Sequence, residues 1–499
     1  MKTKAKKLVT LILTALLVLS VLPFGAVAAP TAVTPTSTAS ITVENAVKDD
    51  ELAAYKVVDT TYVAATNTLD HAWNSAFADY FAGTTSYNAT AYTVEAFAAL
   101  TDDSNDLKAL LAQLPNYIVA KSISPVDTQT VAADGTATFA NLAMGEYFIR
   151  PTSTTSVYQL MLQKIEPTVV GGTYKIDDLT FGAKHKEVSV GKTANKTSVT
   201  KNEKVTYTIT VEIPTYASQA VDKSFYVSDL LPDGLILDAG SIKVARNGTD
   251  ITDAAGTQYT LNTTATAEYT FKLSVDTDKY AASWSANGGK QLVITYTATL
   301  NNNNTTAVNV KETNTVTFDY SNYPYVENSH AQKRDTVDVT TFAIKIDKYV
   351  DGESTTKLAG AKFDLYRTVY PGEAGGVLIP HTPVQGIKLE GDKVTGANGA
   401  ASFEKYEANG TNYDYYLVET QAPSGYNILD NAVKVNFTDA DVEGTAGVYT
   451  VEVPNSSGIK LPITGGTGTV IFTVIGIALM VGAVVLLVVT RKKSAKESK

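Results

Sequence analysis

The chain has 499 residues, a formal net charge of −10, no cysteine and only four histidines. The acidic balance disfavours binding to nucleic acid, because a phosphate backbone requires a basic surface. Without cysteine there can be no disulfide, metal–thiolate site or cysteine nucleophile, and the histidines form no HExxH pair. The sequence also contains no Walker loop, GxGxxG or GxSxG motif. We therefore expect a protein that is not an enzyme and that needs neither a cofactor nor a metal.

Residues 1–29 have the organisation of a secretory signal peptide. A lysine-rich start precedes an apolar stretch from Leu8 to Leu22, and the segment closes with Ala26-Val-Ala-Ala29. This order is typical of a leader that directs export by the Sec route and is then removed. The following residues, 30–40, are rich in Thr, Pro and Ser, and we predict a flexible segment there.

The rest of the exported chain is predicted to be all-β, with three tandem immunoglobulin-like β-sandwich domains. Alternating apolar and polar residues, most clearly over 205–213, indicate strands with one buried and one wet face. We place the domains at 30–187, 188–340 and 341–457. Helical patterns at 94–100 and 106–114 predict helical insertions in the first domain.

In the third domain, three polar residues share the parity of the buried apolar residues on their strands. They are Lys348, Glu419 and Asn455, whereas Lys345 has the opposite parity. Because unpaired buried charges cost several kcal/mol, the lysine is expected as a neutral amine and the glutamate as a carboxylic acid. These are the reactants for an intramolecular isopeptide bond. Lys348 would attack the Asn455 amide carbon while Glu419 hydrogen-bonds the carbonyl and transfers the proton, and ammonia would leave.

The second domain shows the same pattern of inward polar residues. Lys192, Asp229 and Asn314 each share a face with apolar residues of their strand, and Asn322 has the same parity as Asn314. Asn322 is therefore an alternative partner for the lysine.

The segment 461–499 combines a short motif, an apolar span and a basic tail. Leu461-Pro-Ile-Thr-Gly465 precedes an uncharged run, 470–489, that is long enough to cross a bilayer as a helix, and Arg491-Lys-Lys493 follows. This arrangement resembles a sortase sorting signal of LPxTG form. The resemblance implies cleavage after Thr464 and transfer of its carboxyl to an amine, on peptidoglycan or on another protein.

Motifs in the third domain resemble those of Cna protein B-type domains. Tyr416-Leu-Val-Glu-Thr-Gln-Ala-Pro-Ser-Gly-Tyr426 is similar to the E-box, Leu358-Ala-Gly-Ala361 to the second-strand motif, and Val453-Pro-Asn455 to the closing strand. The resemblance spans this domain and implies the Lys348–Asn455 bond. In the first domain, 145–150 has the shape of the E-box strand, but Arg150 stands where the acid should be, so we predict no bond there.

The order of these segments resembles that of the backbone subunit, or major pilin, of sortase-assembled Gram-positive pili. That resemblance implies a second bond between Lys192 and Asn314, assisted by Asp229. Each bond would tie the first strand of a sandwich to its last. The implied function is a cell-wall-anchored pilus that supports adhesion, and the alternative is an ancillary pilin or a wall-anchored adhesin outside the polymer backbone.

The resemblance also implies partners and an attachment lysine. A class C sortase would join Thr464 of one copy to a lysine near the first domain junction of the next copy, and a housekeeping sortase would attach the polymer to peptidoglycan. Minor pilins would accompany it. The usual YPKN-type motif is missing, and Phe181-Gly-Ala-Lys184-His-Lys186 stands in its place. We expect Lys184 to be the attachment residue, with Lys186 as the second choice.

Overall fold

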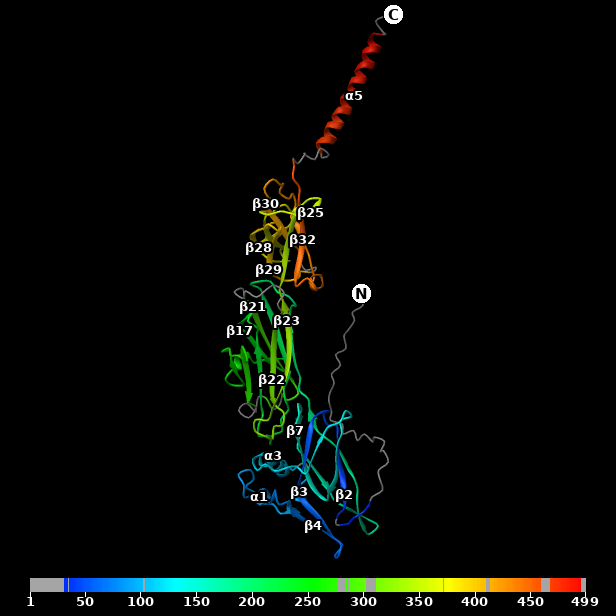
Figure 1. Cartoon of the computed structure of the whole chain (residues 1–499), viewed down its shortest axis with the longest axis vertical. Helices are drawn as coiled ribbons and strands as arrows, with labels where there is room; N and C mark the ends of the chain where they lie inside the picture. Colours follow the sequence, from blue (N-terminus) through cyan, green and yellow to red (C-terminus); the bar gives the residue numbers. More distant parts are fainter. Residues whose placement is uncertain are drawn as a thin grey trace, which may run out of the picture.

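The computed structural model describes residues 31–34, 36–101, 104–276, 284, 287–301, 311–370, 372–409, 413–458 and 467–494, and the side chains of the last segment over 472–490. The predicted signal peptide and the motif at 461–465 lie outside these residues. The described sheets form three successive groups, stacked end to end with a separate helix beyond the third (Figure 1). This architecture confirms the prediction of tandem β domains.

The first group of sheets contains thirteen strands. Their bounds are β1 Thr31–Ala32, β2 Thr38–Glu44, β3 Glu51–Val63, β4 Thr68–Trp73, β5 Asp127–Thr130, β6 Ala137–Ala143, β7 Gly145–Ser153, β8 Val157–Tyr158, β9 Met161–Ile165, β10 Thr168–Val170, β11 Thr173–Ile176, β12 Leu179–Gly182 and β13 His185–Lys186. The larger sheet has the order β4-β3-β7-β9, and β12-β2-β6 packs against it across a shared core. Because β1 pairs with β11, the predicted flexible segment at 30–40 is wrong from Thr31 onward.

Three helices lie between β4 and β5, as the sequence predicts for this domain: α1 Ala78–Phe81, α2 Val94–Ala98 and α3 Asn105–Ala120. The longest, α3, starts where Ser104 Oγ accepts a hydrogen bond from Leu107 N at 3.0 Å, which satisfies one free donor of the first turn. Its apolar face and the aromatic residues of α1 pack on the outer face of β3 and β7. The insertion therefore builds a second core on the back of the sheet.

The second group is a sandwich of two five-stranded sheets around one large core. Its elements are β14 Val190–Ala194, β15 Lys204–Glu212, β16 Ser224–Leu230, β17 Leu235–Arg246, β18 Thr249–Asp250, η1 Thr252–Ala254, β19 Thr260–Asn262, β20 Phe271–Asp276, β21 Gln291–Leu300, β22 Lys311–Ser321 and β23 His330–Thr340. The sheet orders are β14-β15-β21-β17-β18 and β19-β20-β16-β22-β23. The strict alternation in β15, β21 and β22 turns one face of each strand into this core.

The third group is a smaller sandwich. Its elements are β24 Phe342–Val350, β25 Glu353–Lys357, β26 Lys362–Thr368, β27 Val377–Leu378, β28 Gln385–Val394, β29 Ala400–Tyr406, β30 Tyr415–Gln421, β31 Val433–Val435, η3 Asp439–Val442 and β32 Val448–Asn455. The first strand, β24, pairs antiparallel with β29 and parallel with the last strand, β32. The opposing sheet has the order β27-β28-β26-β30-β31.

Beyond the third domain, α5 spans Thr467–Ser494. Its segment Phe472–Thr490 has 19 residues with a mean hydropathy of 2.9, and its apolar side chains are exposed. The length and composition suit a bilayer span, in agreement with the predicted transmembrane helix at 470–489.

Candidate functional site

The third-domain cluster forms where β24, β30 and β32 meet. Lys348 lies on β24, Glu419 on β30 of the opposing sheet, and Asn455 at the end of β32. Each side chain points inward because it shares the parity of the apolar residues on its strand. Their exposed fractions are 0%, 2% and 2%, so the three polar groups share one dry site.

The contacts in this cluster connect all three side chains. The Lys348 Nζ donates to the Asn455 Oδ1 at 2.5 Å and to the Val453 carbonyl at 3.0 Å, and it lies 3.7 Å from Glu419 Oε1. The Asn455 Nδ2 donates to both Glu419 oxygens, at 3.0 and 3.2 Å. The backbone nitrogen of Leu429 donates to Glu419 Oε2 at 2.8 Å, which fixes the carboxyl group in place.

Burial shifts the protonation equilibria of this cluster toward the neutral forms. It lowers the pKa of Lys348 to about 8, although the nearby Glu419 opposes the shift. Burial also raises the pKa of Glu419 above its ordinary value, against the Leu429 hydrogen bond and the Lys348 charge. A neutral amine, an acid and a carboxamide can therefore coexist here.

Glu419 contacts a different atom of Asn455 from the one expected from the sequence. Sequence reasoning placed the acid on the Asn455 carbonyl, whereas the structure places it against the Nδ2 amide. The carbonyl oxygen instead accepts from Lys348. An acid beside Nδ2 is positioned to protonate the nitrogen that must leave as ammonia.

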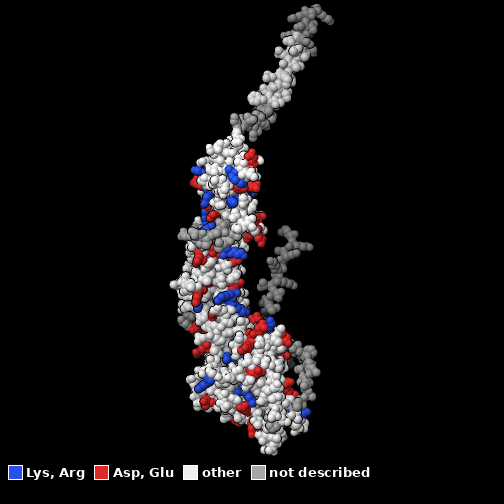
Figure 2. Space-filling model, in the orientation of Figure 1, with Lys and Arg blue, Asp and Glu red and all other residues white. Residues whose placement is uncertain are grey.

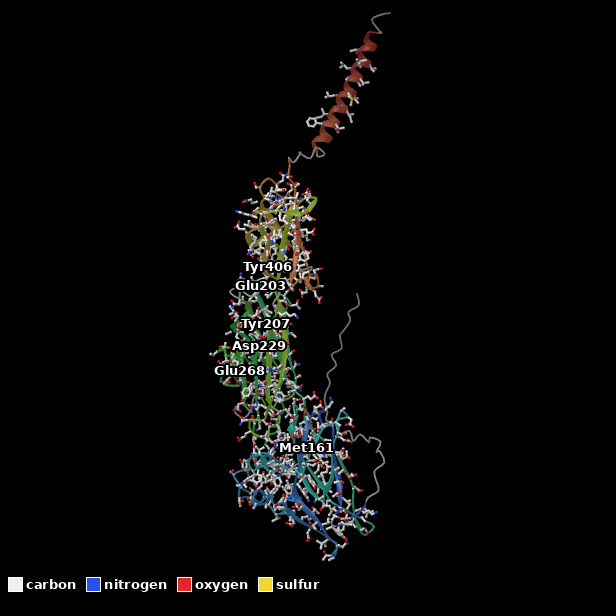
Figure 3. All side chains as sticks on the ribbon, in the orientation of Figure 1. Met161, Glu203, Tyr207, Asp229, Glu268 and Tyr406 are labelled. Atoms are coloured by element: carbon white, nitrogen blue, oxygen red, sulfur yellow. The ribbon has the colours of Figure 1, made fainter. Side chains whose placement is uncertain are left out.

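The second-domain cluster joins both sheets of the middle sandwich. Lys192 lies on β14, Asp229 on β16 and Asn314 on β22. The exposed fractions of these residues are 5%, 0% and 0%. The Lys192 ammonium and the Asp229 carboxylate form a buried ion pair, and burial lowers the pKa of Lys192 and raises that of Asp229. Asp229 lies deep in the middle domain, near Tyr207 (Figure 3).

Sequence reasoning missed a fourth member of this cluster, Tyr296 on β21. Its hydroxyl accepts from Lys192 Nζ at 2.8 Å and from Asn314 Nδ2 at 2.7 Å, and it donates to Asp229 Oδ1 at 2.7 Å. Strand alternation in β21, which also turns Ile294 into the core, indicates that the Tyr296 side chain points inward. A tyrosine on an apolar face was passed over because it is usually a packing residue.

Between the two candidate asparagines, the structure brings Asn314 to the cluster and leaves Asn322 elsewhere. The Asn322 Nδ2 donates to the Thr154 carbonyl of the first domain at 2.6 Å, and its Oδ1 accepts from Ser329 Oγ at 3.0 Å. By contrast, the buried Oδ1 of Asn314 has no hydrogen-bond partner among the described residues. No short hydrogen bond among the described residues therefore competes for this carbonyl.

The strand that carries Asn314 is not the last one of its sandwich. β22 is followed by β23, which pairs with it along its whole length from Lys311↔Thr340 to Ser321↔His330. The expectation that each bond would join first and last strands therefore fits β24 and β32 but is wrong for the second domain. A bond from β14 there would reach the penultimate strand.

The two junction lysines line a pocket of about 310 Å³ between the first and second domains, with Tyr158, Tyr216 and Tyr325 among its walls. Lys186 is held by Glu212, with Nζ and Oε1 2.9 Å apart. Lys184 is exposed, and its amine forms no ion pair or hydrogen bond within the described part of the chain. Of the two junction lysines, Lys184 is therefore the one whose amine has no partner in the described structure.

In the first domain, Arg150 lies partly buried with its guanidinium 5.7 Å from the centre of the Tyr55 ring. The buried acid of the same strand is Glu146, and its neighbour Lys164, 3.6 Å away, has a side chain that is 35% exposed. No buried Lys–acid–Asn cluster occurs in the described residues of this domain. The absence of a bond there remains a prediction.

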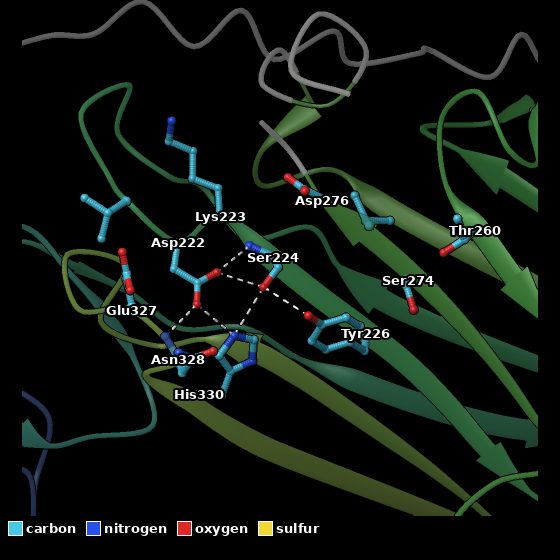
Figure 4. A pocket seen from close by; sticks show the side chains of 12 residues that line it. Asp222, Lys223, Ser224, Tyr226, Thr260, Ser274, Asp276, Glu327, Asn328 and His330 are labelled. Atoms are coloured by element: carbon cyan, nitrogen blue, oxygen red, sulfur yellow. Dashed lines mark hydrogen bonds and ion pairs between the residues drawn. The ribbon is translucent and has the colours of Figure 1, made fainter. Parts of the chain in front are cut away.

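A second pocket, of about 490 Å³, has His330, Ser224 and Asp222 in its lining, the residue types of a serine hydrolase (Figure 4). His330 Nδ1 contacts Asp319 at 2.5 Å, and Nε2 contacts Asp222 at 3.1 Å and Ser224 Oγ at 3.2 Å. Burial alone would lower the pKa of His330, but the two carboxylates outweigh it and raise the pKa to about 9. The two carboxylates favour the charged imidazolium, and Ser224 donates to Asp222, so the histidine is not arranged as a base for the serine.

Acidic and basic side chains are interspersed over the face shown in Figure 2. This distribution fits the overall acidic balance and gives no sign of the basic surface that a nucleic-acid partner would require, as far as the described residues on that face extend.

Comparison with known families identifies two parts of the chain. Residues 342–450 match the SpaA family, described as a prealbumin-like fold domain, and residues 453–496 match the LPXTG cell wall anchor motif. The chain carries a SpaA-type domain and a cell wall anchor. It is therefore a surface protein anchored to the cell wall.

Curated relatives are fimbrial and surface proteins. The fimbrial subunit type 1 of Actinomyces viscosus is 27% identical over 330 residues, which cover 58% of this chain and 61% of the relative. The trypsin-resistant surface T6 protein of Streptococcus pyogenes serotype M6 is 27% identical over 369 residues, covering 60% of this chain and 66% of the relative. The chain thus matches less than two thirds of the length of either protein.

Solved structures show the same fold. The T6 backbone pilin of serotype M6 Streptococcus pyogenes, which has a modular three-domain structure, aligns with a TM-score of 0.60 at 17% identity and covers 85% of this chain and 99% of that one. The full-length major pilin SpaD from Corynebacterium diphtheriae aligns with a TM-score of 0.55 at 17% identity, with coverages of 85% and 99%. The chain therefore has the fold of these pilins and, in addition, an LPXTG cell wall anchor.

Proposed function

We propose that the protein is the backbone subunit of a pilus, polymerised covalently by a class C sortase and attached to peptidoglycan by a housekeeping sortase. The observation that carries this proposal is the exposed amine of Lys184, which has no partner among the described residues and lies in a pocket at the first domain junction of a chain that carries an LPXTG anchor. The fold of major pilins and the fimbrial relatives support it. Neighbouring copies of the chain and minor pilins are the partners, and the polymer supports adhesion.

The reaction would use Thr464 and Lys184. Sortase would cleave the Thr464–Gly465 bond and hold the Thr464 carbonyl as an acyl intermediate, and the Lys184 amine of the next copy would attack that carbonyl. Because Lys186 is engaged by Glu212 at 2.9 Å, its amine must break an ion pair before it can react. This difference favours Lys184.

The two buried clusters would supply intramolecular isopeptide bonds that strengthen the shaft. In the third domain, the Lys348 Nζ would bond to the Asn455 carbonyl carbon, the bond from that carbon to Nδ2 would break, and Glu419 would carry one proton from Nζ to the departing ammonia. The contacts at 2.5 Å and 3.0 Å support this route. Each cluster reacts once in its own molecule, so the protein is a structural subunit and not a turnover catalyst.

The junction between the second and third domains suits a load-bearing rod. Lys196 pairs with Glu407 of the third domain at 2.8 Å and with Glu203 of its own domain at 2.9 Å, and the backbone nitrogen of Lys201 donates to the Lys405 carbonyl at 2.9 Å. These contacts fix the orientation of the two domains.

The test is polymerisation of the purified exported chain by a class C sortase from a pilus-forming Gram-positive organism. Wild-type protein is expected to give a ladder of covalent multimers that resists denaturing electrophoresis. The variant Lys184→Ala should give none, while the matched control Lys186→Ala should still polymerise. A ladder that persists in Lys184→Ala and disappears in Lys186→Ala would reassign the lysine. The absence of a ladder from wild-type protein would favour the ancillary pilin or adhesin.

A further inference from the structure

The two buried clusters use acids of different length, and the shorter one does not reach its asparagine. In the third domain, Glu419 touches the Asn455 amide directly, at 3.0 and 3.2 Å. In the second domain no hydrogen bond joins Asp229 to Asn314. The aspartate side chain is one methylene shorter, and the Tyr296 hydroxyl occupies the space between them.

We infer that Tyr296 is a catalytic residue of bond formation in the second domain, a phenol that relays a proton between Asp229 and the amide of Asn314. This inference rests on the proposed isopeptide bond. The Tyr296 hydroxyl touches both reacting nitrogens, Lys192 Nζ at 2.8 Å and Asn314 Nδ2 at 2.7 Å, and donates to Asp229 Oδ1 at 2.7 Å.

Every proton that the relay transfers comes from a group within the cluster, so no outside reactant is needed. Asp229 takes a proton from the Lys192 ammonium and leaves a neutral amine, which attacks the carbonyl carbon of Asn314. As that carbon becomes tetrahedral, its nitrogen gains a lone pair that can accept the Tyr296 proton. The phenol recovers a proton from Asp229, the old carbon–nitrogen bond breaks and ammonia leaves. Asp229 then takes one of the two protons on the lysine nitrogen, and the other stays as the N–H of the new amide.

The surroundings keep the phenol neutral and in place for this role. Burial raises the pKa of Tyr296 well above its ordinary value, and the Asp229 charge adds to the shift, so the hydroxyl keeps its proton. The ring stacks on Tyr207 at 5.4 Å and meets Phe271 edge-on at 5.1 Å between ring centres. Because these ring contacts do not involve the hydroxyl, a phenylalanine at position 296 should preserve the packing.

Tyr207 provides a matched control in the same site. Its ring centre lies 5.3 Å from Lys192 Nζ, as far as that of Tyr296. Burial raises the pKa of Tyr207, and Asn314 near its hydroxyl acts against that rise, but the hydroxyl makes no short hydrogen bond within the described structure and none to Asp229. Removal of this hydroxyl changes the local polarity without breaking the chain from Asp229 to Asn314.

The experiment follows the loss of ammonia by intact mass in the exported chain, sampled from the time of synthesis, with peptide mapping to assign each bond. General acid–base catalysis contributes roughly 10²- to 10⁴-fold, so Tyr296→Phe should form the Lys192–Asn314 bond about 100-fold more slowly. The Lys348–Asn455 bond of the same molecules should form at the wild-type rate, and so should both bonds of Tyr207→Phe. If wild-type protein forms no Lys192–Asn314 bond, the proposed cross-link and the relay both fail, while the sortase ladder still tests polymerisation separately.

Two results would overturn the relay. One is a Tyr296→Phe protein that forms the bond at the wild-type rate, and the other is a Tyr207→Phe protein that is slowed equally. A rescue variant tests the geometry: in Tyr296→Phe with Asp229→Glu, the longer acid can reach the Asn314 amide directly, as Glu419 reaches Asn455. The double variant is expected to recover at least about tenfold in rate. A double variant as slow as Tyr296→Phe would refute the bridging role.

Discussion

The substitution Glu419→Gln should prevent formation of the third-domain cross-link while keeping the shape of the site. Glutamine fills the same volume and can still accept from Leu429 N, a contact of 2.8 Å in the wild type, but it cannot transfer a proton to the amide of Asn455. Without the cross-link, the unfolded state of the domain gains the conformational entropy of an open chain, which lowers the free energy of unfolding. The Lys348–Asn455 bond would close a loop whose ends are 107 positions apart in sequence.

The chain-entropy relation gives about 4.7 kcal/mol for a loop of about 100 residues. A domain of about 115 residues has an unfolding entropy of about 240 cal/mol/K, so the third-domain melting temperature should fall by about 20 °C. Calorimetry of the exported chain would measure this change, with intact mass showing that the bond is absent. The control is Glu404→Gln on the exposed face of β29, which should leave both bond and transition unchanged. A Glu419→Gln protein that lacks the bond but melts at the wild-type temperature would refute the reasoning.

Two further predictions concern pH and force. Two carboxylates, Asp222 and Asp319, raise the pKa of His330 from 6.5 to about 9 in the folded protein, against the effect of burial. The stabilisation by this histidine is therefore fully present below pH 6.5 and is lost as pH rises through 9. The difference in denaturant midpoint between wild type and His330→Gln should shrink over that range, and a constant difference would contradict the assignment. When wild-type protein is pulled between positions 184 and 464, the segments 193–313 and 349–454 should not extend, because the cross-links bypass them. An uncrosslinked third domain should lengthen the molecule by about 35 nm when it unfolds, at ~3.4 Å per residue over the 107 positions. An extension of this size in the wild type would contradict the cross-link.

The proposed attachment points also give a physical reason for the predicted absence of a cross-link in the first domain. Tension would enter each subunit at Lys184 and leave at Thr464, so residues before 184 would lie outside the path of force. Within that path, the β22–β23 hairpin remains loaded, because the second-domain bond would reach only Asn314 and β23 follows it. Its eleven paired positions, from 311 to 321, would then carry load through backbone hydrogen bonds.

Strand parity explains how much of the site could be predicted from sequence. Lys192, Lys348 and Glu419 were placed correctly in the core because a strand alternates strictly and each carries apolar neighbours two residues away. The same rule applied to Tyr296, but a buried tyrosine is ordinarily a packing residue, and only its three hydrogen bonds distinguish it.

Other features could not be predicted from strand alternation, because they depend on contacts between residues far apart in the sequence. The choice between Asn314 and Asn322 required the position of the first domain, which binds Asn322 through the Thr154 carbonyl. The segment after Pro30 looked flexible by composition, yet Thr31 pairs with Ile176 on β11, 145 positions away. Likewise, the side of the Asn455 amide that faces Glu419 is set by the positions of Lys348 and Val453 around it.

The most direct test of the account is the intact mass of the wild-type exported chain, residues 30–464, followed by peptide mapping. The account predicts a mass lower by two ammonias than the sequence mass, with the losses located at Lys192–Asn314 and Lys348–Asn455. A protein of full sequence mass, or losses mapped to other residues, would contradict it.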